Sequence, residues 1–318
     1  MNLLEDKPLF TEVFSPADSF QLASTDIVIR GQRKEERHSW TDILPGQQVI
    51  EVSVIDEARF SVISGTDFKE YYFRSKVDID QLLTDISLNA SCVIMDLTSL
   101  PHAIWALLLR GGLKRNIALK ACYAEPLDYQ QHATPPMEGE IFDLSERIEG
   151  VRPLPGFASF QDDIEEDFIL VPLLGFEGTR LAYIIETTQP KGGHIIPIIG
   201  VPGFQPEFIF HTYLGNKLPL LRTSSHFKAR FAPANCPFSL SYLLEQIADE
   251  HKLALLKIAL IGTKPHALGA FLFERRNKRQ VEFIYDHPVR KENRTIGLTK
   301  LLVYNVSAFL DAGRLLVN

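Results

Sequence analysis

Two periodicities of apolar residues alternate along the chain from residue 49 onward. Runs with the length and composition of strands occupy residues 49–56, 59–64, 91–100 and 116–126. Two stretches have helical spacing instead, residues 80–87 and 101–112. Pro101 suits a first helical turn, and Gly111 and Gly112 suit a helix end. Strands that alternate with crossover helices predict an α/β fold with a mainly parallel sheet and helices on both faces, Rossmann-like in the loose sense.

The second half of the chain shows one order of elements twice. Two stretches each read as strand, glycine turn, helix and second strand, residues 167–206 and 254–288. When Gly175 is set against Gly262, Leu181 falls on Leu268 without a gap. An amphipathic helix is predicted between the two stretches, and a strand leading into a short helix is predicted after them. The pattern indicates a weak internal repeat and a second Rossmann-like domain.

Shifts in composition predict where the domains begin and end. A stretch rich in proline, glycine and acidic residues separates the two patterned halves, as a linker does. We expect an N-terminal extension at 1–48, a Rossmann-like domain at 49–127, a linker at 128–167 and a second Rossmann-like domain at 168–318. The charged stretch Arg30–Trp40 reads as a turn or a solvated face. The acidic run at 161–167 reads as exposed linker, with a metal site as the alternative.

The composition limits the partners that the chain can have. Its 318 residues are 45% hydrophobic and 23% charged, which is typical of a globular protein. The formal net charge of −7 gives no general attraction to a nucleic-acid backbone, so we expect no extended duplex as a partner. The three cysteines are far apart and form no CxxC pair, which indicates reduced core residues. Without a signal-peptide pattern or a long apolar run, we expect a cytoplasmic protein with no membrane partner.

Polar residues gather where the predicted strands end. In parallel sheets these ends collect ligands, because loop amides and helix N-termini converge there. The candidate ligand-binding residues are Asp96, Gly175, Glu177, Thr179, Arg180, Gly262, Thr263, Lys264, His266, Tyr285 and Asp286.

The stretch Gly262-Thr263-Lys264 is the strongest of these candidates. Glycine lets the backbone approach a ligand, threonine suits the N-cap, and lysine adds a cation beside amides that already favour anions. These parts predict a phosphate site, although neither GxxxxGK[ST] nor GxGxxG is present. The alternative is an ordinary helix cap with one solvated lysine.

The other candidates each carry an alternative as well. Arg180 would add a second cation and Glu177 would accept from a ribose or base, or the two would form a surface pair. His266 reads as an acid or base, or as a polar neighbour of the cap. Asp96 suits Mg²⁺ or a ribose hydroxyl, or caps the helix that follows it. Since GxSxG, HExxH and paired CxxC motifs are missing, the sequence predicts no catalytic residue, no metal and no cofactor, and leaves open whether the protein is an enzyme.

The stretch "IGTKPHALGA" followed by "VEFIYDHP" resembles the ligand loop of CRISPR-associated Rossmann-fold (CARF) sensor domains. The matching positions are Gly262, Thr263, Lys264, Leu268, Tyr285 and Asp286, while Ile261 and His266 depart from the pattern. Those sensors bind cyclic oligoadenylates, usually across a dimer, and switch an attached effector. The resemblance therefore implies a homodimer, a phosphorylated small molecule or cyclic oligonucleotide as ligand, an effector protein as partner, and a role in antiviral defence.

Three functions are compatible with these residues. The first is a cytoplasmic sensor that binds a nucleotide or second messenger and passes the signal to an effector. The second is a nucleotide phosphodiesterase or hydrolase that uses Asp96, Glu177 or His266. The third is an adaptor subunit of a defence complex whose pocket has lost its ligand. A sensor binds without turnover, an enzyme consumes its substrate, and an adaptor does neither.

Overall fold

The structure, a computed structural model, describes residues 10–88, 90–134, 139–157, 168–252, 254–277 and 281–315. The chain forms two compact units. Among the described residues, an eight-stranded unit holds 10–128 and 295–315, and a five-stranded unit holds 129–294. Both are built from helices and sheets, with parallel pairing throughout the five-stranded sheet and mixed pairing in the eight-stranded one, so the predicted mixed α/β class is confirmed.

The five-stranded unit is organised around a parallel sheet. Its strands, in spatial order, are β12 (Arg230–Ala232), β11 (Ile198–Gly200), β10 (Phe168–Leu173), β13 (Leu255–Leu260) and β14 (Val281–Ile284). Strand β10 has the sequence FILVPL and is buried from its second residue onward. A continuous apolar run of this kind is typical of a strand that helices cover on both faces.

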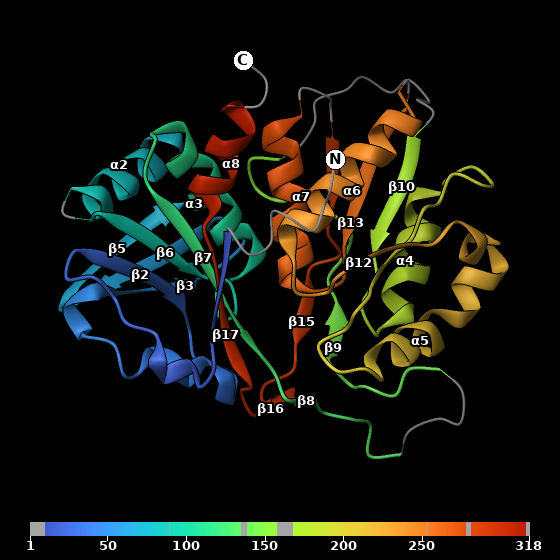
Figure 1. The fold of residues 1–318 in the computed structure, drawn as a ribbon, viewed down its shortest axis with the longest axis horizontal. Helices are drawn as coiled ribbons and strands as arrows, with labels where there is room; N and C mark the ends of the chain where they lie inside the picture. The colour runs from blue at the N-terminus through green and yellow to red at the C-terminus, as the bar shows by residue number, and fades with distance from the viewer. Residues whose placement is uncertain are drawn as a thin grey trace. The chain divides into compact units, whose positions relative to one another are not determined.

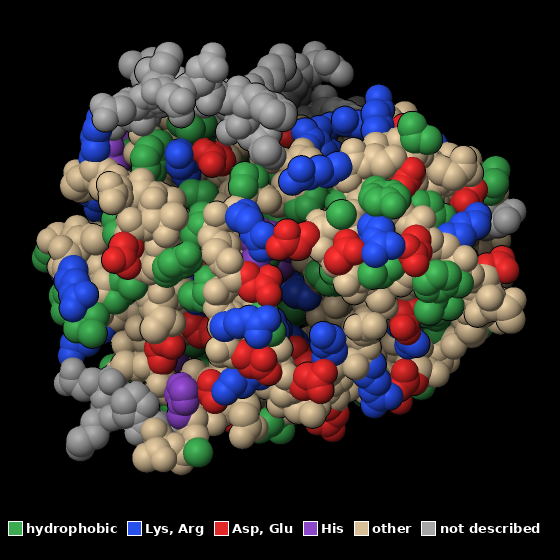
Figure 2. Space-filling model, turned by 180° about the vertical axis from the view of Figure 1, so that it is seen from behind, with side chains coloured by type: hydrophobic (Ala, Val, Ile, Leu, Met, Phe, Trp, Pro, Cys, Tyr) green, Lys and Arg blue, Asp and Glu red, His purple; other side chains and the backbone are tan. Residues whose placement is uncertain are grey.

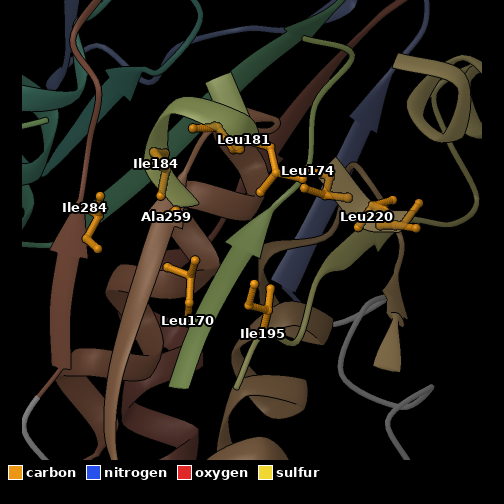
Figure 3. Close-up of a cluster of buried hydrophobic side chains, with 10 residues drawn as sticks. Leu170, Leu174, Leu181, Ile184, Ile195, Leu220, Ala259 and Ile284 are labelled. Carbon is orange, nitrogen blue, oxygen red and sulfur yellow. The ribbon is translucent and has the colours of Figure 1, made fainter. Parts of the chain in front are cut away.

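Four helices cover that sheet. They are α4 (Gly178–Thr188), α5 (Phe208–Arg222), α6 (Pro237–Glu250) and α7 (Lys264–Arg276). Right-handed crossovers put α4 and α5 on one face and α6 and α7 on the other, and the two pairs are recognisable in Figure 1. Figure 3 shows the core under α4 and α5, where Leu181 and Ile184 meet Leu170 and Ala259 of the sheet.

The strand order reverses between β10 and β13. The chain passes from β10 through α4 to β11, and from β13 through α7 to β14 on the opposite side. The loops after β10 and β13 therefore leave the sheet in opposite directions. In open parallel sheets ligands bind at such a reversal.

The eight-stranded unit contains a mixed sheet. In spatial order its strands are β1 (Thr11–Phe14), β17 (Lys300–Tyr304), β7 (Leu119–Glu125), β6 (Cys92–Asp96), β2 (Asp26–Gly31), β3 (Val49–Val54), β4 (Arg59–Ser64) and β5 (Asp67–Tyr72). The four strands from β7 to β3 pair in parallel, and the flanking strands pair antiparallel. The helices of this unit are α2 (Lys76–Ser87), α3 (His102–Lys114) and α8 (Val306–Leu315). The strands and helices predicted between residues 49 and 126 are all present.

The observed units divide the chain differently from the predicted domains. Strand β2 lies in the middle of the eight-stranded sheet, with Val28 and Ile29 fully buried, so the described part of 1–48 is no separate extension. Strand β17 lies between β1 and β7, with Leu302 opposite Tyr123. The segment after residue 294 therefore belongs with the first half of the chain and not with 168–294. Periodicity predicts a strand but does not say which sheet it joins.

The burial of the stretch Arg30–Trp40 also differs from the prediction. Much of it is buried, and it leads into the 3₁₀ helix η2 (Glu36–Thr41). The Arg37 side chain is 2% exposed and donates to Glu35, to the Tyr123 hydroxyl and to the Ala124 carbonyl. The predicted turn or solvated face holds only for residues 32–34 and Glu36, which are exposed, whereas buried acceptors compensate the guanidinium of Arg37.

The internal repeat, the buried cysteines and the acidic linker were also predicted from the sequence. At the offset that aligns Gly175 with Gly262, helices α4 and α7 coincide, but the strands that follow them do not. Cys122 and Cys236 are buried and unbridged, as predicted, and Cys92 is partly buried. The acidic run at 161–167 lies outside the described residues.

No helix among the described residues has the length and apolar character needed to cross a membrane.

Candidate functional site

The two glycine turns meet at the reversal of strand order. A Cβ on Gly262 would lie 2.8 Å from the carbonyl oxygens of Leu173 and Leu174. A Cβ on Gly175 would lie 2.6 Å from the carbonyl oxygen of Ile261. Both distances are too short for any side chain, so the two turns pack backbone against backbone. Glycine is required here for the contact between the loops.

Arg180 lies in the first turn of α4 and binds groups in the loops after β13 and β14. Its Nε and Nη2 donate to Asp286 at 2.7 Å and 2.6 Å, a bidentate ion pair, and its Nη1 donates to the carbonyl of Ile261 at 3.2 Å. Arg180 is 1% exposed and Asp286 is fully buried. Asp286, which follows β14, raises the pKa of Arg180 despite the opposing effect of burial. The pair thus links the loops after β10, β13 and β14. The predicted pairing of Arg180 with Glu177 is also present, at 3.6 Å, but it is buried rather than at the surface.

Glu177 faces a second arginine that the sequence reasoning missed. Arg290, on β15 (Pro288–Arg290), donates to Glu177 at 2.9 Å and to the Ser145 hydroxyl at 3.1 Å. Burial, together with Arg180 and Arg294 nearby, lowers the pKa of Arg290 to about 10. Arg180 and Arg290 therefore share the carboxylate of Glu177, and Arg180 also pairs with Asp286. The signal in the sequence was the basic stretch that follows Tyr285-Asp286.

The predicted phosphate loop forms the N-terminus of α7. The Thr263 hydroxyl donates to the Ala234 carbonyl at 2.7 Å and accepts from the amide of His266 at 3.2 Å. Thr263 is thus the N-cap, as predicted. Lys264 is the first residue of the helix and is partly exposed. Tyr285 is also partly exposed, and its ring lies 4.9 Å from that of His287.

His266 is an interior residue. It is fully buried, and its Nε2 lies 3.0 Å from the carbonyl oxygen of Pro233, which identifies Nε2 as the donor. Burial lowers the pKa of His266 to about 4. The ring is therefore neutral near pH 7, and it is shielded from a ligand that would approach the loop from solvent.

The buried imidazole makes stability depend on pH. An unfolded chain protonates histidine near pH ~6.5. His266 thus contributes stability that is complete above that pH and is lost as the pH falls toward 4. We expect His266→Gln to lose less stability than the wild type between pH 7 and pH 5, measured as urea midpoints at the two pH values. Equal losses in the two proteins would contradict the assignment.

Thr179 has a partner that no motif indicated. Glu140 Oε1 accepts from the Thr179 amide at 2.5 Å. A carboxylate from a distant loop therefore sits at the N-terminus of α4, where a ligand anion was predicted. No local signal connects residues 140 and 179, so sequence reasoning could not find the contact.

Asp96 belongs to the eight-stranded unit, whereas the other candidate residues belong to the five-stranded unit. Its fully buried carboxylate accepts from the Thr98 amide at 3.0 Å and from the Ser99 hydroxyl at 2.5 Å. The Ser99 hydroxyl also accepts from the Gly31 amide at 2.8 Å. Asp96 thus organises the turn before α3, but it does not cap that helix as the alternative predicted, because the N-cap is Pro101 and no side chain caps it.

Within the described ranges, no three histidine, cysteine, aspartate or glutamate side chains are grouped to hold a metal ion. Comparisons with protein-family models, curated proteins and solved structures found no match. The resemblance to CARF sensors, the predicted ligand contacts and the expected partners remain predictions.

Proposed function

We propose that the chain is a binding module for a phosphorylated nucleotide or a related second messenger, held at the reversal of strand order in the five-stranded sheet. The observation that supports this proposal is the partly exposed guanidinium of Arg290, which donates to Glu177 at the N-cap of α4. Arg180 lies nearby and is engaged by Asp286. A ligand phosphate would accept hydrogen bonds from Arg290 near the positive end of the α4 helix dipole.

Arg290 and Lys264 are the cations best suited to contact this ligand. About a quarter of the Arg290 side chain is exposed, whereas Arg180 is enclosed. Lys264 is partly exposed at the first position of α7. In this proposal Arg180 and Asp286 hold the loops in place, and Arg290 and Lys264 meet the phosphate.

We also propose the oligomeric state, the location and the partner of this binding module. Its units would be two Rossmann-like domains of a cytoplasmic homodimer that transmits ligand binding to an effector protein in antiviral defence, as the resemblance to CARF sensors implies. A small ligand is favoured over an extended nucleic acid on charge grounds. On the face shown in Figure 2, basic side chains lie among acidic ones rather than forming a basic patch.

Binding without turnover is favoured over hydrolysis. The side chains that a hydrolase would use are engaged in the fold: Asp96 by Thr98 and Ser99, Glu177 by Arg290, and His266 by Pro233. No observation favours the enzymatic alternative. Incubation with the nucleotide probes below, followed by chromatography, should return them unchanged.

Nucleotide titrations test the site. We expect Lys264→Ala and Arg290→Ala each to weaken a bound nucleotide by about 1–3 kcal/mol, because one charge-assisted contact is lost. ATP, cyclic di-AMP and cyclic oligoadenylates are the probes, and isothermal titration calorimetry is the measurement. Lys252→Ala is the matched control, since Lys252 is an exposed lysine in the same unit. Affinity unchanged in both site variants, or absent for every probe in the wild type, would refute the assignment.

A further inference from the structure

A pocket of about 730 Å³ lies along α4 and α5 in the five-stranded unit. Its walls are mostly apolar and come from Ala182 and Ile185 of α4 and from Leu218 and Pro219 of α5. The backbones of Gly178 and Gly215 meet at one end, where the two helices approach closely. Pockets of this volume and character hold small organic molecules.

At the end of this pocket where Gly178 and Gly215 meet, one carboxylate forms no ion pair with the described residues. Glu140 is half-buried, and its hydrogen bonds come from Thr179. Across the described residues no lysine, arginine or histidine forms an ion pair with it. Burial raises the pKa of Glu140 above its ordinary value, although the hydrogen bonds from Thr179 offset part of that effect. The ionised carboxylate of Glu140 therefore lies in mostly apolar surroundings, which lowers the stability of the folded state.

The other charged groups of the pocket lie in more polar surroundings. Arg222 and Glu186 are exposed, so water screens their charges, and His132 is paired with Asp143 at 3.8 Å. A half-buried charge is screened less by water than an exposed one. The negative charge of Glu140 therefore contributes most to the potential at the end where Gly178 and Gly215 meet.

We propose that the pocket between α4 and α5 binds an organic amine, with its ammonium group on Glu140 and its apolar body against Ala182, Ile185, Leu218 and Pro219. The proposal goes beyond the nucleotide site, which uses Arg290 and Lys264. Thr179 holds the carboxylate in position, and the carboxylate receives the ammonium.

Calorimetric titration with phenethylamine and with its neutral analogue 2-phenylethanol tests the proposal. We expect the wild type to bind the amine about tenfold tighter than the alcohol at pH 7, since only the amine can form a charge-assisted bond with Glu140. Glu140→Gln should abolish this preference, while the matched variant Glu186→Gln should keep it. Ala182→Phe should weaken both compounds by filling the pocket. The ¹⁵N shift of the Thr179 amide, followed in the same titrations, locates the binding.

Thermal stability distinguishes two roles of Glu140, ligand binding and capping of α4. In the wild type without ligand, Glu140 costs stability, so we expect Glu140→Gln to raise the melting temperature at pH 7. A carboxylate that serves only to cap α4 predicts the opposite shift, because glutamine interacts less favourably with the helix N-terminus.

Each outcome supports or overturns this inference independently of the nucleotide site. Equal affinities of the wild type for amine and alcohol, no saturable binding of the amine, or an unchanged preference in Glu140→Gln would overturn it. Arg290→Ala should reduce nucleotide affinity and leave the preference for the amine over the alcohol unchanged. A variant that loses amine binding and keeps nucleotide binding therefore identifies the α4–α5 pocket. A variant that loses nucleotide binding and keeps amine binding identifies the nucleotide site at the reversal of strand order.

Discussion

Replacement of Asp286 by alanine should lower the free energy of unfolding of the five-stranded unit by about 3–5 kcal/mol, the cost of leaving a buried ion unpaired. Asp286 accepts two of the hydrogen bonds of a guanidinium that is 1% exposed. Without that carboxylate, Arg180 keeps only the Ile261 carbonyl at 3.2 Å and Glu177 at 3.6 Å. Neither contact replaces the bidentate pair, and water cannot reach the charge.

Urea denaturation followed by far-UV circular dichroism measures this effect. Tryptophan fluorescence alone is unsuitable, because both tryptophans, Trp40 and Trp105, lie in the eight-stranded unit. The matched control is Glu250→Ala, which removes the partner of Arg230 at 2.8 Å. That pair is about half exposed, so its loss should cost about 1 kcal/mol or less. Comparable losses in the two variants would contradict the structural role of the Arg180–Asp286 pair.

Gly178→Ala should destabilise the same unit by about 1–3 kcal/mol through overpacking. Alanine is the better helix former by about 1 kcal/mol, which alone would make the change favourable. Its Cβ, however, would overlap the backbone carbonyl of Gly215, and backbone cannot move aside as a flexible side chain can. The clash should outweigh the propensity and push α4 away from α5.

The control for this variant is Gly192→Ala. A Cβ on Gly192 meets nothing within 4 Å, so the change should leave stability within about 0.5 kcal/mol of the wild type. Melting temperatures of the two variants, read by circular dichroism, provide the comparison. If Gly178→Ala is as stable as Gly192→Ala, α4 and α5 do not meet through these glycines.

Local order was predictable from the sequence where apolar runs are long and uninterrupted. Strands β6 and β7 and helix α3 fall where periodicity and the flanking Pro101 indicated them. Membership in a sheet was not predictable, because it depends on contacts between distant segments. Strand β17 reads as a strand in isolation, but nothing in its residues says that its neighbours are β1 and β7.

The candidate site was predictable in its location and less so in its contacts. Gly175 and Gly262 do meet at the reversal of strand order, yet each is needed for the other loop rather than for a ligand. Arg180 was predicted either as a ligand contact or as part of a surface pair, but it is buried, and Asp286, more than a hundred residues away, makes that burial tolerable. Arg290 and Glu140 escaped notice because their partners, Glu177 and Thr179, are also distant in sequence.

The return of β17 to the first sheet has a consequence for synthesis on the ribosome. All of residues 129–294 are made before residues 300–304, which complete the eight-stranded sheet. The ends of this internal stretch are adjacent, since the Gln130 amide donates to the Arg294 carbonyl at 2.9 Å. The five-stranded unit can therefore close while β1 and β7 still wait with open edges, a state in which a nascent chain is prone to aggregate. Those edges are closed only when β17 pairs with both strands.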